Sequence, residues 1–146
     1  MKRTDVRFKK LDERAIVPTF GTEFAAGADL YTLDGAEIPA GGTAWLGTGI
    51  ALEIPEGYVG LIFARSSLGT KRGLAPANKV GVVDSDYRGE IRVVLHNHSN
   101  EAQTVDAGER IAQMVIIPYL PVNYIEADEL DDTDRGEKGF GSTGKY

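Results

Sequence analysis

One carboxylate in this sequence follows an apolar run and precedes a turn. The run Gly81–Val83 is followed by Asp84, and residues 85–89 are mostly polar or glycine before the next apolar run begins. A carboxylate at the end of a strand can act as a general base that takes a proton from water. Aspartate and serine are also common in hairpin turns for structural reasons alone. The segment therefore predicts either a hydrolytic base at Asp84 or a simple hairpin.

A second group of residues consists of hydrogen-bond donors. Arg65 precedes Ser66 and Ser67 at the expected start of a short helix over residues 66–72, where either serine could cap the first turn. A guanidinium, two hydroxyls and the free N–H groups of a helix start suit a phosphate. A capped turn with a surface arginine is the alternative interpretation.

Glycine is frequent at the C-terminal end. Residues 139–145 match the letters of two phosphate-binding loops, but both motifs need a strand before the glycines and a helix after them. Acidic residues precede this segment, and Tyr146 stands where a P-loop needs serine or threonine, so both interpretations are rejected. The glycine backbone and the hydroxyls of Ser142 and Thr143 could still converge on an anion. A mobile terminus has the same composition.

Three further residues have chemistry that could serve a site. His96 and His98 would share one face of a strand, a spacing that can bind a metal ion, but no third ligand is obvious and an exposed strand edge is the alternative. Trp45 lies in an apolar run and is therefore predicted to be a core residue.

Composition and charge exclude several classes of protein. The absence of cysteine excludes disulfides, thiolate metal sites and a cysteine nucleophile. The net charge is −6, and residues 126–134 hold six acids and no base, so the remainder is balanced at 16 acids and 16 bases. Without a basic surplus we expect no nucleic-acid binding. No apolar run approaches the length of a membrane span, and the N-terminal residues 1–10 are basic and polar, so we expect a cytoplasmic protein.

The elements that must position these residues are predicted to be strands. Short apolar runs separated by glycine and proline turns favour an all-β fold, a sandwich or a jelly-roll-like barrel. The charge pattern divides the chain into a body over residues 1–125, an acidic hinge over 126–134 and a glycine-rich arm over 135–146. The clearest strands are expected over residues 6–11, 44–54, 58–63, 91–96 and 111–120.

Taken together, these segments resemble the trimeric dUTPase (deoxyuridine 5′-triphosphate nucleotidohydrolase) family. Each segment alone is a weak signal, but five in the family's order are specific. The departures are mild: Ser67 stands where many members have glycine, and Ala64 where proline is common. The matching segments are residues 26–31, 65–69, 81–90, 108–113 and 135–144.

The resemblance implies a jelly-roll-like, distorted β-barrel of the β-clip type with a flexible C-terminal arm. It also implies a homotrimer whose three active sites lie between subunits. The implied activity is that of a dUTP diphosphatase, in which water attacks the α-phosphorus and releases dUMP and pyrophosphate. Such an enzyme limits uracil incorporation into DNA and supplies dUMP for thymidylate synthesis.

The resemblance also implies roles for individual residues. Asp84 is the base, Mg²⁺ arrives with the triphosphate and waters rather than on protein ligands, and Asp29 lies at the periphery without a firm role. Tyr87 packs under the deoxyribose and excludes a 2′-hydroxyl. The remaining nucleotide-binding residues are Asn78, Gly81, Val82 and Val83 at the uracil edge, Arg65, Ser66, Ser67 and Gln113 at the phosphates, Arg135, Phe140, Gly141, Ser142 and Thr143 in the closing arm, and Arg92, to which no particular contact is assigned.

Two other functions fit parts of the pattern. A dCTP deaminase of the same fold shares the Arg-Ser-Ser-Leu segment, but it uses a glutamate where Val94 stands and lacks an arm with Phe140. A non-catalytic nucleotide-binding module would have no use for Asp84. A purely structural, capsid-like jelly roll has no support in the motifs.

Overall fold

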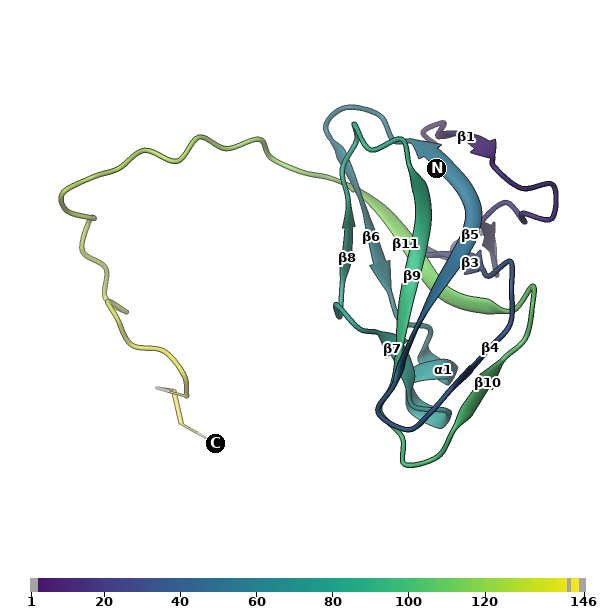
Figure 1. Ribbon diagram of the computed structural model, residues 1–146. Coiled ribbons are helices and arrows are strands. Elements are labelled where there is room, and N and C mark those ends of the chain that lie inside the picture. The colour runs from purple at the N-terminus through teal and green to yellow at the C-terminus, as the bar shows by residue number, and fades with distance from the viewer. Residues whose placement is uncertain (1–2, 142, 145–146) are drawn as a thin grey trace.

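The computed structural model describes residues 3–141 and 143–144, and its regular secondary structure consists of antiparallel strands with one short helix among the described residues (Figure 1). One sheet has the strand order β1-β5-β9-β7, a second has the order β2-β3-β11-β6-β8, and β10 pairs with β4 in a small third sheet. This confirms the predicted all-β fold. The elements are β1 (Arg7–Lys10), β2 (Thr19–Phe20), β3 (Ala28–Tyr31), β4 (Ala36–Ile38), β5 (Thr43–Glu53), β6 (Tyr58–Phe63), α1 (Ser66–Lys71), β7 (Leu74–Pro76), β8 (Gly81–Val83), β9 (Glu90–Asn97), β10 (Gln103–Val105) and β11 (Arg110–Pro118).

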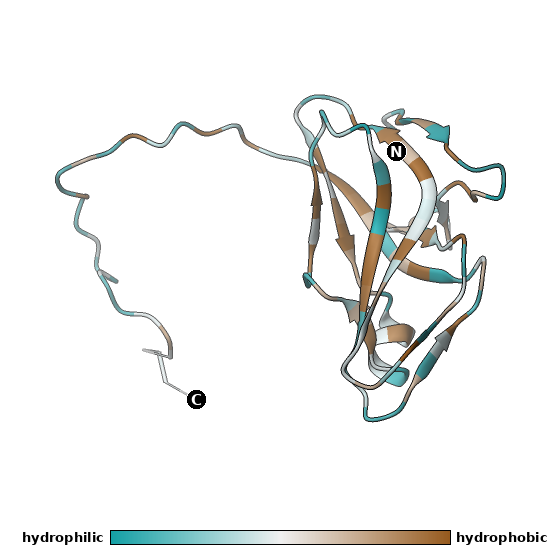
Figure 2. Ribbon diagram, viewed as in Figure 1, coloured by the Kyte–Doolittle hydropathy of each residue, from teal (hydrophilic) through white to brown (hydrophobic). Residues whose placement is uncertain are grey.

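The core lies between the two larger sheets. Along β9 the side chains alternate: Ile91, Val93 and Leu95 are buried, while Arg92 is exposed on the opposite face. In Figure 2 the strands carry most of the hydrophobic residues, and β9 shows hydrophilic bands between its apolar ones. Core side chains from other strands include Leu30, Ile50, Ile62, Ile111 and Met114.

Two local predictions were wrong. Trp45 is 74% exposed, because its neighbour Leu46 takes the buried side of β5 and successive side chains point to opposite faces. Neither Ser66 nor Ser67 caps the helix: the N-cap residue is Arg65, in an extended conformation, and no side-chain hydrogen bond caps α1. The two serines therefore lie inside the first turn.

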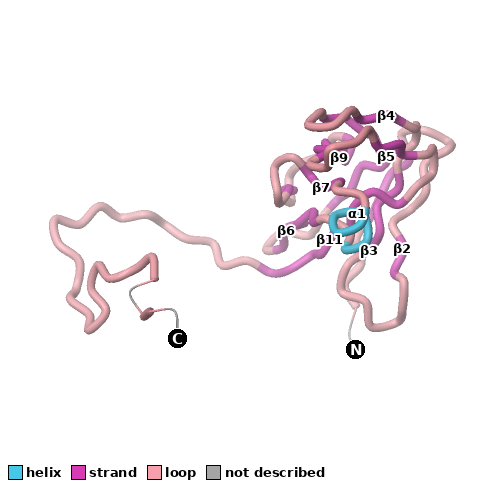
Figure 3. The backbone as a smooth tube through the Cα atoms, turned by 90° about the horizontal axis from the view of Figure 1, so that it is seen from below, coloured by secondary structure: helices cyan, strands magenta, loops and turns pink. Residues whose placement is uncertain are grey.

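The chain leaves the sheets after β11. Residues 119–141 and 143–144 contain no helix or strand, and in both views the segment runs away from the sheets (Figures 1 and 3). Its apolar side chains are exposed, with Tyr124 at 98% and Ile125 at 87%. Within the described residues, no helix has the length and hydrophobicity of a membrane span.

Asn97 is a fully buried polar residue that ties β9 to two neighbouring segments. Its side-chain amide donates to the carbonyl oxygens of Ile38 (2.9 Å) and Glu101 (2.7 Å). Its side-chain oxygen accepts from the backbone N–H (3.0 Å) and the hydroxyl (2.7 Å) of Ser99. Both donors and both lone pairs are therefore used, which is what a buried amide requires.

We expect Asn97→Ala to lower the free energy of unfolding by about 2–4 kcal/mol, because the substitution leaves several buried polar groups without partners. Thermal unfolding at fixed protein concentration measures the effect. Asn100→Ala is the matched control, since Asn100 is exposed and the change should stay within about 0.5 kcal/mol. Equal stability of the two variants would show that the Asn97 network contributes little.

Candidate active site

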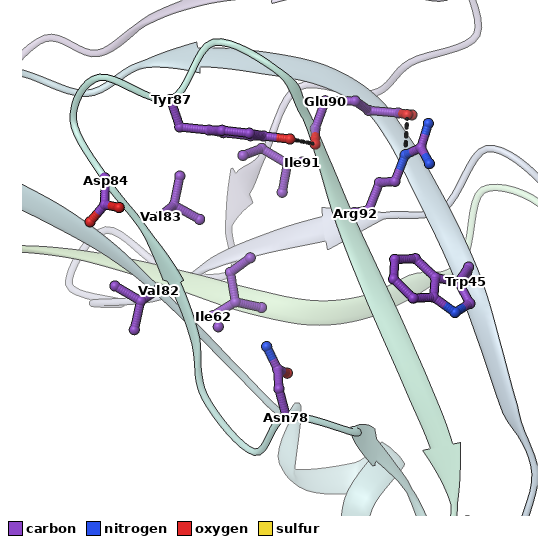
Figure 4. A pocket seen from close by; sticks show the side chains of 11 residues that line it. Trp45, Ile62, Asn78, Val82, Val83, Asp84, Tyr87, Glu90, Ile91 and Arg92 are labelled. Atoms are coloured by element: carbon purple, nitrogen blue, oxygen red, sulfur yellow. Dashed lines mark hydrogen bonds and ion pairs between the residues drawn. The ribbon is translucent and has the colours of Figure 1, made fainter.

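A pocket of about 480 Å³ lies where the loop between β8 and β9 approaches β5 (Figure 4). The hairpin predicted for residues 81–91 was wrong, because β8 pairs with β6 and β9 with β5 and β7, so the loop crosses between two sheets. It brings together residues that the sequence analysis assigned to the base, the sugar and the catalytic carboxylate. The residues that line it are Trp45, Ile62, Asn78, Gly81, Val82, Val83, Asp84, Tyr87, Glu90, Ile91 and Arg92.

Strand β8 forms one wall of this pocket and is the edge strand of its sheet. Among the residues that the structure describes it pairs only with β6, from Gly60↔Val83 to Ile62↔Gly81. The outer row of backbone N–H and C=O groups on an edge strand has no partner in the sheet. Such a row can hydrogen-bond the edge of a planar base, with the amide of Asn78 at one end of the pocket (Figure 4).

Asp84 is the first residue after β8 and stands exposed at the rim of the pocket. The turn that follows is closed by the Tyr87 N–H, which donates to the Asp84 carbonyl oxygen at 3.2 Å. In Figure 4, Asp84 and Tyr87 lie at the end opposite to Asn78. A carboxylate in this place can reach a water molecule near a group that extends past the rim.

The Tyr87 ring is held in one orientation. Its hydroxyl donates to the Glu90 carbonyl oxygen at 2.9 Å. The Arg88 guanidinium bonds two carbonyl oxygens of the same turn, those of Ser85 (2.6 Å) and Tyr87 (3.1 Å). The ring therefore forms a fixed surface on the pocket.

Glu90 links the end of the loop between β8 and β9 to β5. Its carboxylate accepts from the Gly49 N–H at 3.0 Å and from Arg92 Nε at 2.8 Å. Arg92 is thus in the pocket wall, paired with Glu90 and still 60% exposed at its side chain. The role of Glu90 is not visible in the sequence, because its partner Gly49 lies 41 positions away and no motif joins the two residues.

The predicted phosphate donors lie elsewhere, around the junction of β6 and α1. Arg65 Nε donates to Asp29 Oδ1 at 2.9 Å, and Arg110 pairs with Asp29 Oδ2 at 3.3 Å. The side chains of Asp29 and Arg65 are only 14% and 22% exposed. Gln113 donates to the Ala64 carbonyl oxygen at 2.9 Å. Asp29, to which no firm role was assigned from the sequence, therefore orients Arg65.

The register of β6 separates these donors from the pocket within one chain. Val83 pairs with Gly60, so Asp84 lies beside the start of β6, whereas Arg65 comes after its end. Asp84 and Arg65 are thus separated by six residue positions along β6. At ~3.3 Å per residue, they lie about 20 Å apart along the strand direction. Arg65, Ser66, Ser67 and Gln113 are all absent from the pocket lining.

The arm residues also lie away from the pocket (Figure 1). Phe140 is fully exposed, and the Arg135 guanidinium donates to the Lys138 carbonyl oxygen at 2.9 Å within the arm itself. Gly141 and Thr143 follow without helix or strand. Ser142 lies outside the described residues.

Potential metal ligands do not gather in the described part of the chain. No three or more His, Cys, Asp or Glu side chains within residues 3–141 and 143–144 are placed to hold one ion. His96 points to the less buried face of β9 and His98 follows the strand, exposed.

Comparison with known proteins identifies the family. The model of the dUTPase family matches residues 13–144. This chain belongs to the dUTPase family. The deoxyuridine 5′-triphosphate nucleotidohydrolase of Nautilia profundicola is 49% identical over 140 residues, covering 96% of this chain and 99% of that protein. The protein of the same name from Escherichia phage T5 is 46% identical over 143 residues, covering 92% of this chain and 96% of that protein.

The fold of this dUTPase family member also matches solved structures. The dUTPase of Staphylococcus bacteriophage 80alpha with dUPNHPP superposes with a TM-score of 0.91 at 27% identity, covering 98% of this chain and 100% of that one. These comparisons confirm the resemblance and the jelly-roll-like fold that it implied.

Proposed function

We propose that this protein hydrolyses dUTP to dUMP and pyrophosphate, and so limits uracil incorporation into DNA and supplies dUMP. The observation that carries the proposal is the pocket, which combines an unpaired strand edge, an aromatic surface at Tyr87 and the carboxylate of Asp84. The names of the similar proteins support it. A cytoplasmic location remains a prediction.

The uracil would lie against the edge of β8, within reach of Asn78, with the deoxyribose on the Tyr87 ring. The α-phosphorus then comes to the rim beside Asp84. Asp84 takes a proton from a water molecule, the water oxygen bonds to the α-phosphorus, and the bond from that phosphorus to the bridging oxygen breaks. Pyrophosphate leaves with the electron pair of the broken bond. Phosphoryl chemistry of this kind depends mainly on positioning and on charge neutralisation.

The phosphate charges require donors beyond those in the pocket. Arg65, already oriented by Asp29, supplies a guanidinium, and Ser66, Ser67 and Gln113 supply hydroxyl and amide groups. Mg²⁺ bound to the triphosphate would neutralise part of its charge.

We further propose that the active site is shared between the subunits of a homotrimer. Within one chain, the base-binding end of the pocket near Asn78 faces the α1 end of β6, and Asp84 lies at the far end. A nucleotide whose sugar rests on Tyr87 would direct its phosphates past Asp84, away from Arg65 of the same chain. The donors therefore have to come from another copy.

The first test of the function concerns Asp84. Asp84→Asn keeps the shape of the side chain but cannot accept a proton, so we expect dUTP hydrolysis to fall by roughly 10²–10⁴-fold while nucleotide binding persists. Pyrophosphate release from dUTP, UTP, dTTP and dCTP with Mg²⁺ measures it. Asp86→Asn, in the same exposed turn, is the matched control and should retain activity. Full activity of Asp84→Asn would place the base elsewhere.

The second test concerns the shared site. Light scattering should give about 47 kDa, three copies of 15.7 kDa. Arg65→Gln and Asp84→Asn should each be nearly inactive, but trimers assembled from an equal mixture should recover about a quarter of the sites, because intact residues then meet across subunits. Mixtures as inactive as the separate variants would refute sharing.

The third test concerns the arm. Its four glycines make ordering costly, at about 1–2 kcal/mol per fixed residue, so phosphate contacts and stacking of Phe140 on the base must offset that cost. We expect a chain ended after Asp134 to keep its melting temperature and to lose most of its turnover. Amide exchange in residues 135–146 of the intact chain should slow only with a non-hydrolysable dUTP analogue. Equal protection without nucleotide would contradict closure.

A further inference from the structure

The Tyr87 ring lies directly against the backbone of Gly89. A Cβ atom built on Gly89 would stand 2.6 Å from Tyr87 Cζ and 3.0 Å from Cε2, with the phenolic oxygen closer still. Real Cβ atoms essentially never approach other atoms below 3.0 Å, so any side chain at Gly89 would move the ring. The ring occupies the space that the missing side chain leaves.

The need for glycine at this position is a need for space alone. Gly89 is not among the glycines with a left-handed φ, unlike Gly49 and Gly57. An alanine at Gly89 would therefore meet no backbone strain and would act through its contact with Tyr87.

The Tyr87 ring is also held by the Glu90 carbonyl oxygen, which accepts a hydrogen bond from the Tyr87 hydroxyl at 2.9 Å. Glu90 cannot shift freely, because its carboxylate accepts the Gly49 N–H of β5 and the guanidinium of Arg92. The turn before it is braced by Arg88. With its turn and its hydroxyl both anchored, the ring cannot yield to a new side chain without leaving its place on the pocket wall.

We propose that Gly89, together with the Glu90 carbonyl group, is a positioning element that fixes the Tyr87 ring and thereby sets the preference for deoxyribose over ribose. The inference rests on the proposed function, in which the sugar packs on this ring. The ring excludes a 2′-hydroxyl only while it stays in van der Waals contact with the sugar. A small displacement of the ring away from the sugar would make room for one oxygen atom.

The experiment compares the ratio of kcat/KM for dUTP to kcat/KM for UTP. Gly89→Ala should lower this ratio about tenfold or more, toward the value of Tyr87→Ala. Gly21→Ala is the matched control: a Cβ there meets nothing within 4 Å, φ is not left-handed, and the ratio should not change. An unchanged ratio in Gly89→Ala would overturn the proposal.

A double-variant cycle separates an effect on the position of the Tyr87 ring from a general effect on the loop between β8 and β9. If Gly89 acts through the ring, adding Gly89→Ala to Tyr87→Ala should change the ratio less than about twofold. An equal fall in both backgrounds would overturn the proposal. If Gly89→Ala fails to fold, Tyr87→Phe tests the positioning of the ring by removing its hydrogen bond to Glu90. This loss should lower the ratio, and an unchanged ratio would refute the positioning role of the Glu90 carbonyl group. Failure of the wild type to hydrolyse dUTP would instead refute the proposed function.

Discussion

The pairing of β6 with β8 on one side and β11 on the other is the constraint on which the rest of the site depends. The β8 register places Asp84 beside the beginning of β6. The β11 register, with Gln113↔Phe63, places Gln113 beside its end, next to Arg65. In the proposed mechanism, the two halves of the site, Asp84 and the phosphate donors, therefore lie at opposite ends of β6, and strand geometry keeps these halves apart within one chain.

Each half is prepared before a nucleotide arrives. Asp29 lies between Arg65 and Arg110 with little exposure, so the Arg65 guanidinium is already oriented. The Tyr87 ring is equally fixed by its hydroxyl and by the backbone of Gly89. Groups that are fixed in advance lose little freedom on binding, and this is where positioned donors and surfaces gain their effect on rate and selectivity.

The sequence predicts what local patterns determine. The apolar run at residues 58–63 became β6 with the same bounds, and Asp84 follows directly after β8, as the turn chemistry indicated. The pairings of Asp29 with Arg65 and of Glu90 with Gly49 were not predictable, because each joins segments about 40 positions apart through strand register. Trp45 was misjudged because an apolar run does not reveal which of its alternating side chains face the core.

Several large apolar side chains are exposed on the single chain, and their exposure supports the proposed homotrimer. Trp45 stands 74% exposed in the pocket wall, and the segment after β11 leaves Leu120, Tyr124 and Ile125 more than four-fifths exposed. Such side chains can be covered when another molecule packs against them. Arg65 and the other predicted phosphate donors lie outside the pocket of their own chain, and these apolar side chains are exposed; the proposed homotrimer would supply donors to the pocket and cover for the side chains.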